Sequence, residues 1–196
     1  MQNPQKPAGT TTPKLHAPLR AKNPQEIKNL AKAIKRHPLY LVLDNIYDTF
    51  NVGGFFRLAD ALAAKMLILV GGTSTPPDNK IRKASVNTVY AVEWQYFKTA
   101  TQALRFLKRQ EPNIQIVSAE ITPNAVEYTQ VPYKFPLALV FGNETTGVSP
   151  TWLKASHYIA KIPMYGVNHS LNVVVSAAVI GFYALGNSHC TLGSLL

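Results

Sequence analysis

The chain has 196 residues, enough for one domain with a substantial core but too few for two domains of ordinary size. Hydrophobic residues make up 46% and charged residues 15%, which excludes a largely disordered chain. The single cysteine, Cys190, excludes an internal disulfide and a cysteine-cluster metal site, so no metal is expected. The longest apolar run, 171–185, is too short to span a bilayer, and no secretory signal is evident. We therefore expect a cytoplasmic protein with no membrane partner.

The formal net charge is +10, and most of the excess lies near the N-terminus. Residues 1–38 hold eight basic residues against one acid, whereas the remainder holds twelve against nine. A basic arm can bind RNA phosphates, because neutralising them releases condensed counterions. Charge alone fits a solubilising tail equally well.

The first 38 residues form the first predicted region. Residues 1–23 contain four prolines, a glycine and a run of three threonines, which predicts a flexible arm. Residues 24–36 open on Pro24 and space Ile27, Leu30 and Ile34 at helical intervals. This pattern predicts a short amphipathic helix with a lysine-rich outer face.

From residue 39 onward, short apolar runs alternate with segments of helical periodicity. The expected strands are 39–44, 66–71, 92–97, 114–119, 137–142 and 157–162. The expected helices are roughly 52–64, 81–88, 99–110, 150–156 and 171–185. This alternation predicts one α/β domain over 39–190, with a parallel sheet covered on both faces.

Three loops at the predicted carboxyl ends of strands are rich in Asn, Gly and charged residues. They are 44–57, 142–149 and 163–172. Ligands of open α/β sheets bind at this edge, so these loops are the expected site. No G-x-G-x-x-G follows any strand, which argues against a standard dinucleotide fold.

In the first loop, Asn51 is predicted to cap the following helix, and Arg57 is expected within reach of the same loop. Taken alone, Arg57 also fits an ordinary surface arginine. In the third loop, Ser170 is predicted to cap the apolar C-terminal helix. Asn172 follows in its first turn, where a buried amide would need hydrogen-bond partners.

Together the three loops resemble the motifs of the SpoU (TrmH-like) branch of the SPOUT methyltransferases. Asn51 to Arg57 resembles the N-x-G-x-x-x-R element, and Phe141 to Gly147 resembles F-G-x-E-x-x-G. Ile162 to Val173 resembles I-P-M-x-G-x-x-x-S-L-N-V. The order and spacing match, and the similarity covers about residues 39 to 185. Leu58 and Val174 depart from the residues common in the family but lie outside the motif positions.

The resemblance implies a parallel-sheet SPOUT-type domain with a C-terminal trefoil knot, an exception to the rule that chains avoid knots. It implies S-adenosylmethionine as cofactor and a homodimer whose site is completed across the interface. The implied catalytic residues are Arg57, Asn51, Glu144, Ser170 and Asn172. The implied cofactor contacts are Gly142, Ile162 and Leu171, together with Val140, Phe141 and Met164.

The implied activity is methyl transfer to a ribose 2′-hydroxyl of RNA. Only the arm and a short helix precede the domain, which favours transfer RNA over ribosomal RNA. The alternatives are a non-catalytic RNA-binding protein of the same fold, a base-methylating SPOUT enzyme, and an α/β enzyme acting on a small molecule. Arginine is an awkward general base because its pKa is about 12.5 or higher. The simpler expectation is that Arg57 binds an RNA phosphate and stabilises charge on the attacking oxygen.

Overall fold

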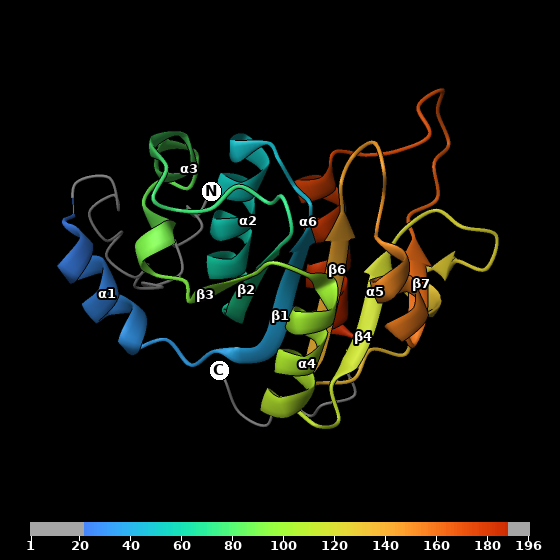
Figure 1. The fold of residues 1–196 in the computed structure, drawn as a ribbon, viewed down its shortest axis with the longest axis horizontal. Coiled ribbons are helices and arrows are strands. Elements are labelled where there is room, and N and C mark those ends of the chain that lie inside the picture. Colours follow the sequence, from blue (N-terminus) through green and yellow to red (C-terminus); the bar gives the residue numbers. More distant parts are fainter. Residues whose placement is uncertain (1–21, 188–196) are drawn as a thin grey trace, which may run out of the picture.

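The computed structural model describes residues 22–187 (Figure 1). The arm up to residue 21 and Cys190 lie outside the described residues. The first helix, α1 (Pro24–Lys32), begins with a capping box, in which Asn23 and Glu26 each accept a hydrogen bond from the other's backbone N–H. It ends about one turn before the predicted boundary, and its only buried residue is Ile27.

Within residues 22–187, seven parallel strands form one sheet in the order β3-β2-β1-β6-β4-β7-β5. The strands are β1 (His37–Asp44), β2 (Ala64–Val70), β3 (Trp94–Phe97), β4 (Gln115–Ala119), β5 (Val126–Glu127), β6 (Leu137–Gly142) and β7 (Tyr158–Lys161). The six predicted strands are all present, each within two residues of its predicted ends. The two-residue β5 was not predicted, because it is too short to show a pattern.

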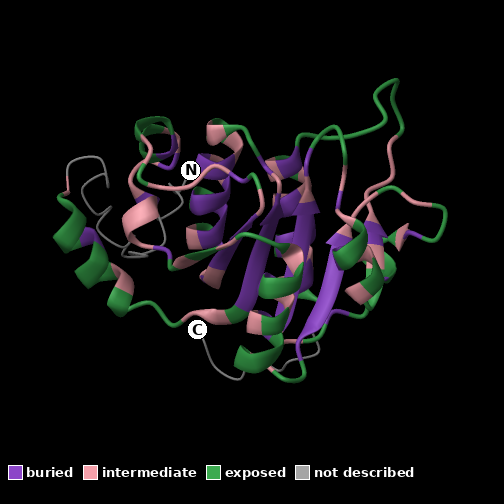
Figure 2. Ribbon diagram, viewed as in Figure 1, coloured by how far each residue is buried: buried purple, intermediate pink, exposed green. Residues whose placement is uncertain are grey.

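Helices cover both faces of the sheet, which confirms the predicted parallel α/β architecture (Figures 1 and 2). The remaining helices are α2 (Thr49–Ala61), α3 (Asn79–Ala84), α4 (Ala100–Gln110), α5 (Pro150–Ala155) and α6 (Val173–Gly186). The packing of the buried residues places α2 and α6 on one face and α4 and α5 on the other. The predicted helix over 81–88 is instead the short α3 followed by a 3₁₀ turn, Thr88–Tyr90.

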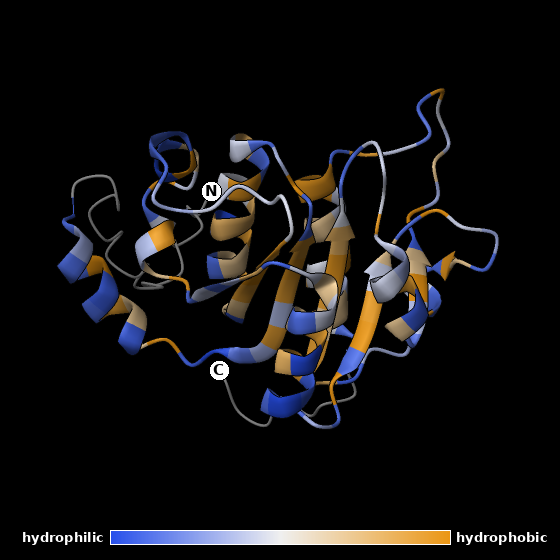
Figure 3. Ribbon diagram, viewed as in Figure 1, coloured by the Kyte–Doolittle hydropathy of each residue, from blue (hydrophilic) through white to orange (hydrophobic). Residues whose placement is uncertain are grey.

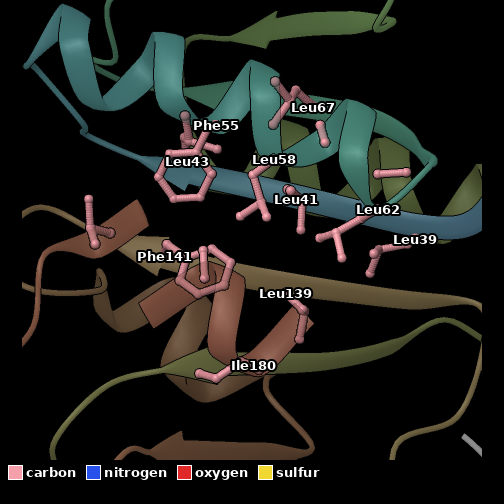
Figure 4. Close-up of a cluster of buried hydrophobic side chains, with 14 of the residues drawn as sticks. Leu39, Leu41, Leu43, Phe55, Leu58, Leu62, Leu67, Leu139, Phe141 and Ile180 are labelled. Atoms are coloured by element: carbon pink, nitrogen blue, oxygen red, sulfur yellow. The ribbon is translucent and has the colours of Figure 1, made fainter. Parts of the chain in front are cut away.

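The core consists of two apolar layers separated by the sheet. Successive residues of a strand point to opposite faces, so Leu41 and Leu43 of β1 pack beneath α2 and α6 (Figure 4), whereas Val42 packs beneath α4 and α5. Burying a leucine side chain contributes about 1.5–3 kcal/mol. Because both faces of the central strands β1, β2 and β6 are buried, these strands are mostly apolar (Figure 3), which explains why they appear in the sequence as nearly continuous apolar runs. Among residues 22–187, no helix has the length and apolar character needed to cross a membrane.

Candidate active site

The first two predicted loops are joined at the carboxyl ends of β1 and β6. These strands are neighbours, and Asp44 is in register with Gly142. The Asp44 carboxylate accepts a hydrogen bond from the backbone N–H of Ser149 at 2.8 Å. The Asn143 side-chain amide donates to the backbone oxygen of Asn45 at 3.0 Å. The loop 142–149 is therefore anchored to the start of the loop that leads into α2.

Three side chains, one from each predicted loop, form a hydrogen-bonded chain. The Asn172 amide donates from Nδ2 to Oδ1 of Asn51 at 3.0 Å. The Asn51 amide in turn donates from Nδ2 to Oε1 of Glu144. Because Asn51 both accepts and donates, its amide orientation is fixed from two sides. The three loops therefore meet at one place, as the sequence predicted.

Both predicted helix caps are wrong. Asp48, not Asn51, caps α2 through its carboxylate, and Asn51 lies inside the first turn. Asn172, not Ser170, caps α6, since its Oδ1 accepts from two backbone N–H groups. Asn, Asp and Ser are nearly equivalent as N-caps, so the residue type alone did not decide among neighbouring candidates. Asn172 is also exposed rather than buried, although it has the hydrogen-bond partners that were expected.

A cavity of about 440 Å³ lies where these loops meet, at the carboxyl ends of β4, β6 and β7. Five of the six predicted cofactor residues line it: Phe141, Gly142, Ile162, Met164 and Leu171. Val140 does not line it, and its role as a cofactor contact stays a prediction. Its side chain points to the opposite face of the sheet and is buried against α4 and α5, because strand neighbours alternate in direction.

The predicted catalytic residues divide into two groups. Glu144, Ser170 and Asn172 line the cavity, and Asn51 contacts it through Glu144 and Asn172. Arg57 does not line the cavity, and its catalytic role stays a prediction. Its side chain is exposed on α2, and no hydrogen bond or ion pair of its guanidinium is found within residues 22–187.

Glu120, which was not among the predicted site residues, also lines the cavity. Its carboxylate accepts from the N–H of Ile121 at 2.8 Å and from the N–H of Val148 at 2.7 Å. Glu120 therefore fixes the loop 142–149 from the side of β4. A carboxylate directly after the apolar run 114–119 was the available signal, since that position is the carboxyl end of a parallel strand.

Two glycines let the backbone of the second loop pack on itself. A Cβ at Gly142 would overlap the backbone of Gly147 and Val148. Gly147 has φ +68°, a left-handed conformation that disfavours a side chain, and a Cβ there would overlap the Glu120 carboxylate. The wall of the cavity at this point is therefore bare backbone, which can present N–H and C=O groups to a ligand.

The cavity combines apolar and polar groups in the way that small-molecule sites do. Phe141, Ile162 and Leu171 offer apolar surface, whereas Glu120 and Glu144 offer carboxylate oxygens. Within the part of the chain that the structure describes, no group of three or more His, Cys, Asp or Glu side chains is arranged to hold a metal. The donor set suits an organic ligand with a flat apolar part and hydroxyl or amino groups.

A family model described as the SpoU rRNA Methylase family matches residues 38–182, a range that contains all three motifs. The chain belongs to the SpoU methylase family. A tRNA (guanosine(18)-2′-O)-methyltransferase of Thermus thermophilus, 33% identical over 152 residues, aligns over 76% of this chain and 76% of its own length. Membership of the SpoU family confirms the resemblance drawn from the three motifs.

Two solved structures share the fold. An AdoMet-bound rRNA methyltransferase from Sinorhizobium meliloti superposes with a TM-score of 0.70 at 27% identity, over 86% of this chain. The TrmH/SpoU tRNA-modifying enzyme of Aquifex aeolicus superposes with a TM-score of 0.69 at 26% identity, over 83% of this chain. The alignment covers 82% of the A. aeolicus chain but only 59% of the S. meliloti chain, less than two thirds of its length.

Proposed function

We propose that this SpoU-family chain transfers a methyl group from S-adenosylmethionine to a ribose 2′-hydroxyl of transfer RNA, and that it does so in the cytoplasm. The observation that carries the proposal is the hydrogen-bonded chain Asn172–Asn51–Glu144 beside the glycine-walled cavity, because it unites all three motifs at one site. A relative named as a tRNA 2′-O-methyltransferase and a neighbour solved with AdoMet support it.

The cavity fits the methyl donor. Its apolar residues Phe141, Ile162 and Leu171 suit an adenine ring, and the bare backbone at Gly142 and Gly147 suits the polar groups of a ribose and an amino acid. When bound, S-adenosylmethionine supplies a methyl group that its sulfonium already activates. The chain's own residues then have to bind the donor and the RNA, orient the ribose toward the methyl group, and exclude water from the cavity.

A ribose 2′-hydroxyl is a weak nucleophile, so the protein must hold its oxygen in line with the methyl group and assist the loss of its proton. Asn51, Glu144 and Asn172 form a fixed edge of the cavity against which the ribose is positioned, with Ser170 beside them. Arg57 binds the adjacent phosphate through its planar guanidinium and stabilises negative charge on the attacking oxygen.

The proposal includes a homodimer in which Arg57 of one copy acts at the cavity of the other. Two observations support it. Arg57 is exposed and does not line the cavity of its own chain. In addition, α6 is apolar around most of its circumference, and Val175 and Phe182 on it are 47% and 54% exposed. Exposed apolar side chains on such a helix are typical of a protein interface.

A trefoil knot at the C-terminus is part of the same proposal. After β7, which lies beyond β4 in the sheet, the chain returns so that α6 packs against α2 and β6. The loop 163–172 therefore passes across the carboxyl ends of the intervening strands. A trefoil knot requires the chain to turn back in this way, so that its C-terminal segment can pass through an earlier loop.

Coverage of the relatives favours transfer RNA as the substrate. The alignments span 76% of the T. thermophilus tRNA enzyme and 82% of the A. aeolicus tRNA-modifying enzyme, but only 59% of the S. meliloti rRNA methyltransferase. Ribosomal RNA is the second candidate, because the description of the matching family names it.

The substrate is tested with tritiated S-adenosylmethionine and two RNA fractions, transfer RNA and ribosomal RNA, from cells that lack the protein. We expect label in transfer RNA, recovered after alkaline hydrolysis as resistant 2′-O-methyl dinucleotides. Label that appears only in ribosomal RNA would move the substrate to the second candidate. Label in a methylated base would contradict ribose methylation, and no label in either fraction would favour a non-catalytic RNA-binding protein.

A further inference from the structure

The short helix α3 presents a cluster of positive charge to solvent. Lys80, Arg82 and Lys83 are all exposed, and no acidic residue occurs between residues 79 and 91. The nearest acid in sequence, Asp78, is engaged with the backbone, since its Oδ1 accepts from the N–H groups of Lys80 and Ile81. Neither of the two ion pairs found within residues 22–187 involves these cations. Their charge is therefore not neutralised within the described part of the chain.

Close packing places this charge beside α2. A Cβ added at Gly53 would lie 2.5 Å from Cβ of Ala84 and 3.0 Å from the backbone oxygen of Ile81. Only glycine at this position lets α3 approach α2 so closely. Figure 1 shows the two helices next to each other, with α3 on the side of α2 that is away from α6.

Helical geometry puts Arg57 on the exposed side of α2, between the contacts with α3 and α6. At 3.6 residues per turn, Arg57 is rotated about 40° from Gly53, which packs on α3, and about 60° from Gly54, which packs on Val174 of α6. Helical side chains also lean back toward the N-terminus, which is the direction of the contact between Gly53 and α3. Arg57 is therefore exposed next to the helix that carries the three cations.

The turn after α3 holds the helix in a defined orientation. Val86 and Asn87 both have left-handed backbone conformations, with φ of 53° and 67°. A β-branched residue is strained in that conformation and adopts it only where the surroundings impose it. Ser85 and Thr88 are buried on either side of the turn, and the Thr88 hydroxyl donates to the Ser85 backbone oxygen at 2.8 Å. The positive charge of α3 is therefore carried on a fixed element.

We propose that Lys80, Arg82 and Lys83 form a phosphate-binding surface that guides the RNA backbone to Arg57. This inference rests on the proposed function and adds to it the path of the RNA on the protein. The charge of a polyanion complements a surface of three unneutralised cations, and such contacts strengthen binding by releasing counterions from the RNA. In the proposed homodimer, an RNA backbone bound on α3 would lie next to the Arg57 that acts at the partner's cavity.

The test compares two triple variants that lose the same charge. The first carries Lys80→Gln, Arg82→Gln and Lys83→Gln on α3. The matched control carries Arg105→Gln, Lys108→Gln and Arg109→Gln, which are also exposed but lie on α4, across the sheet. The dissociation constant for bulk transfer RNA is measured over a series of salt concentrations, and thermal unfolding verifies that both variants remain folded.

We expect the α3 variant to bind transfer RNA on the order of 100-fold more weakly at 0.1 M salt and to lose about 2–3 units of the slope of log K against log salt. The α4 variant should retain the parental slope to within about 0.5 unit. Equal slopes for the two variants, or a parental slope in the α3 variant, would overturn the proposal. In methyl transfer, the α3 variant should show a higher KM for transfer RNA and a nearly unchanged kcat. The lost phosphate contacts would have stabilised the bound RNA equally in the ground state and in the transition state.

A failure of the proposed function can be distinguished from a failure of the phosphate-binding surface. If the proposed function is wrong, the parent protein transfers no methyl group to either RNA fraction, but the salt dependence of RNA binding still shows whether α3 contacts phosphates. A slope lost only in the α3 variant supports the phosphate-binding surface even then. A parent that methylates transfer RNA, with an α3 variant that binds as the α4 variant does, retains the proposed function and rejects the surface.

Discussion

Arg57→Ala is expected to slow methyl transfer to RNA by about 10²–10³-fold or more, the loss typical of removing a group that stabilises transition-state charge. Arg57 is exposed on α2 and does not line the cavity, so its loss should not disturb the cofactor site. Binding of S-adenosylmethionine should therefore remain within about twofold of the parent. Single-turnover transfer of a tritiated methyl group measures the first quantity, and isothermal titration calorimetry measures the second.

Two controls sharpen this prediction. Arg57→Lys keeps the positive charge but loses the planar guanidinium group, which can donate two parallel hydrogen bonds to a phosphate. This variant should therefore retain only a small part of the parental rate. Arg105→Ala removes another exposed arginine, from α4 on the opposite face of the sheet, and should leave the rate unchanged. Turnover near the parental rate in Arg57→Ala would remove this residue from the catalytic role.

Gly142→Ala is expected to abolish measurable binding of S-adenosylmethionine, a loss of at least about 100-fold in affinity. The added Cβ would overlap the backbone of Gly147 and Val148, neither of which can rotate away as a side chain could. The loop 142–149 would have to move out of the cavity wall, and overpacking of this kind costs about 1–3 kcal/mol of folding free energy. Calorimetric titration with S-adenosylmethionine and thermal unfolding measure the two effects.

The matched control is Gly166→Ala, in the third loop. A Cβ at Gly166 would have no heavy atom within 4 Å, so cofactor affinity and stability should both stay close to those of the parent. Equal affinity in the Gly142 and Gly166 variants would show that the backbone at Gly142 is not a wall of the cofactor site.

Much of the fold could be predicted because a parallel sheet buried on both faces leaves a direct pattern in the sequence. The runs 39–44 and 137–142 are mostly apolar because successive residues enter opposite apolar layers. The starts of the helices were harder to predict, because several neighbouring polar residues could each act as the N-cap. Asp48 and Asn172 cap their helices, although Asn51 and Ser170 are suitable cap residues close by.

The sequence predicted which loops form the site better than it predicted which side chains point into it. The motifs identified which loops meet, and the bonds among Asn51, Glu144 and Asn172 join them. Residue order could not show that the Val140 side chain points away from the cavity, because only the folded chain creates that cavity. Glu120 was missed because its role depends on a contact with Val148, 28 residues away.

The proposed site requires that the loops 44–57, 142–149 and 163–172 enclose the methyl donor. Titration of ¹⁵N-labelled protein with S-adenosylmethionine tests it directly through the amide resonances. We predict that the largest shifts occur in residues 142–149 and 163–172 and extend to the side-chain amides of Asn51 and Asn172, which the hydrogen bonds connect to the cavity. Shifts confined to another surface, such as the groove between α1 and β3 lined by Lys28 and Trp94, would contradict the account.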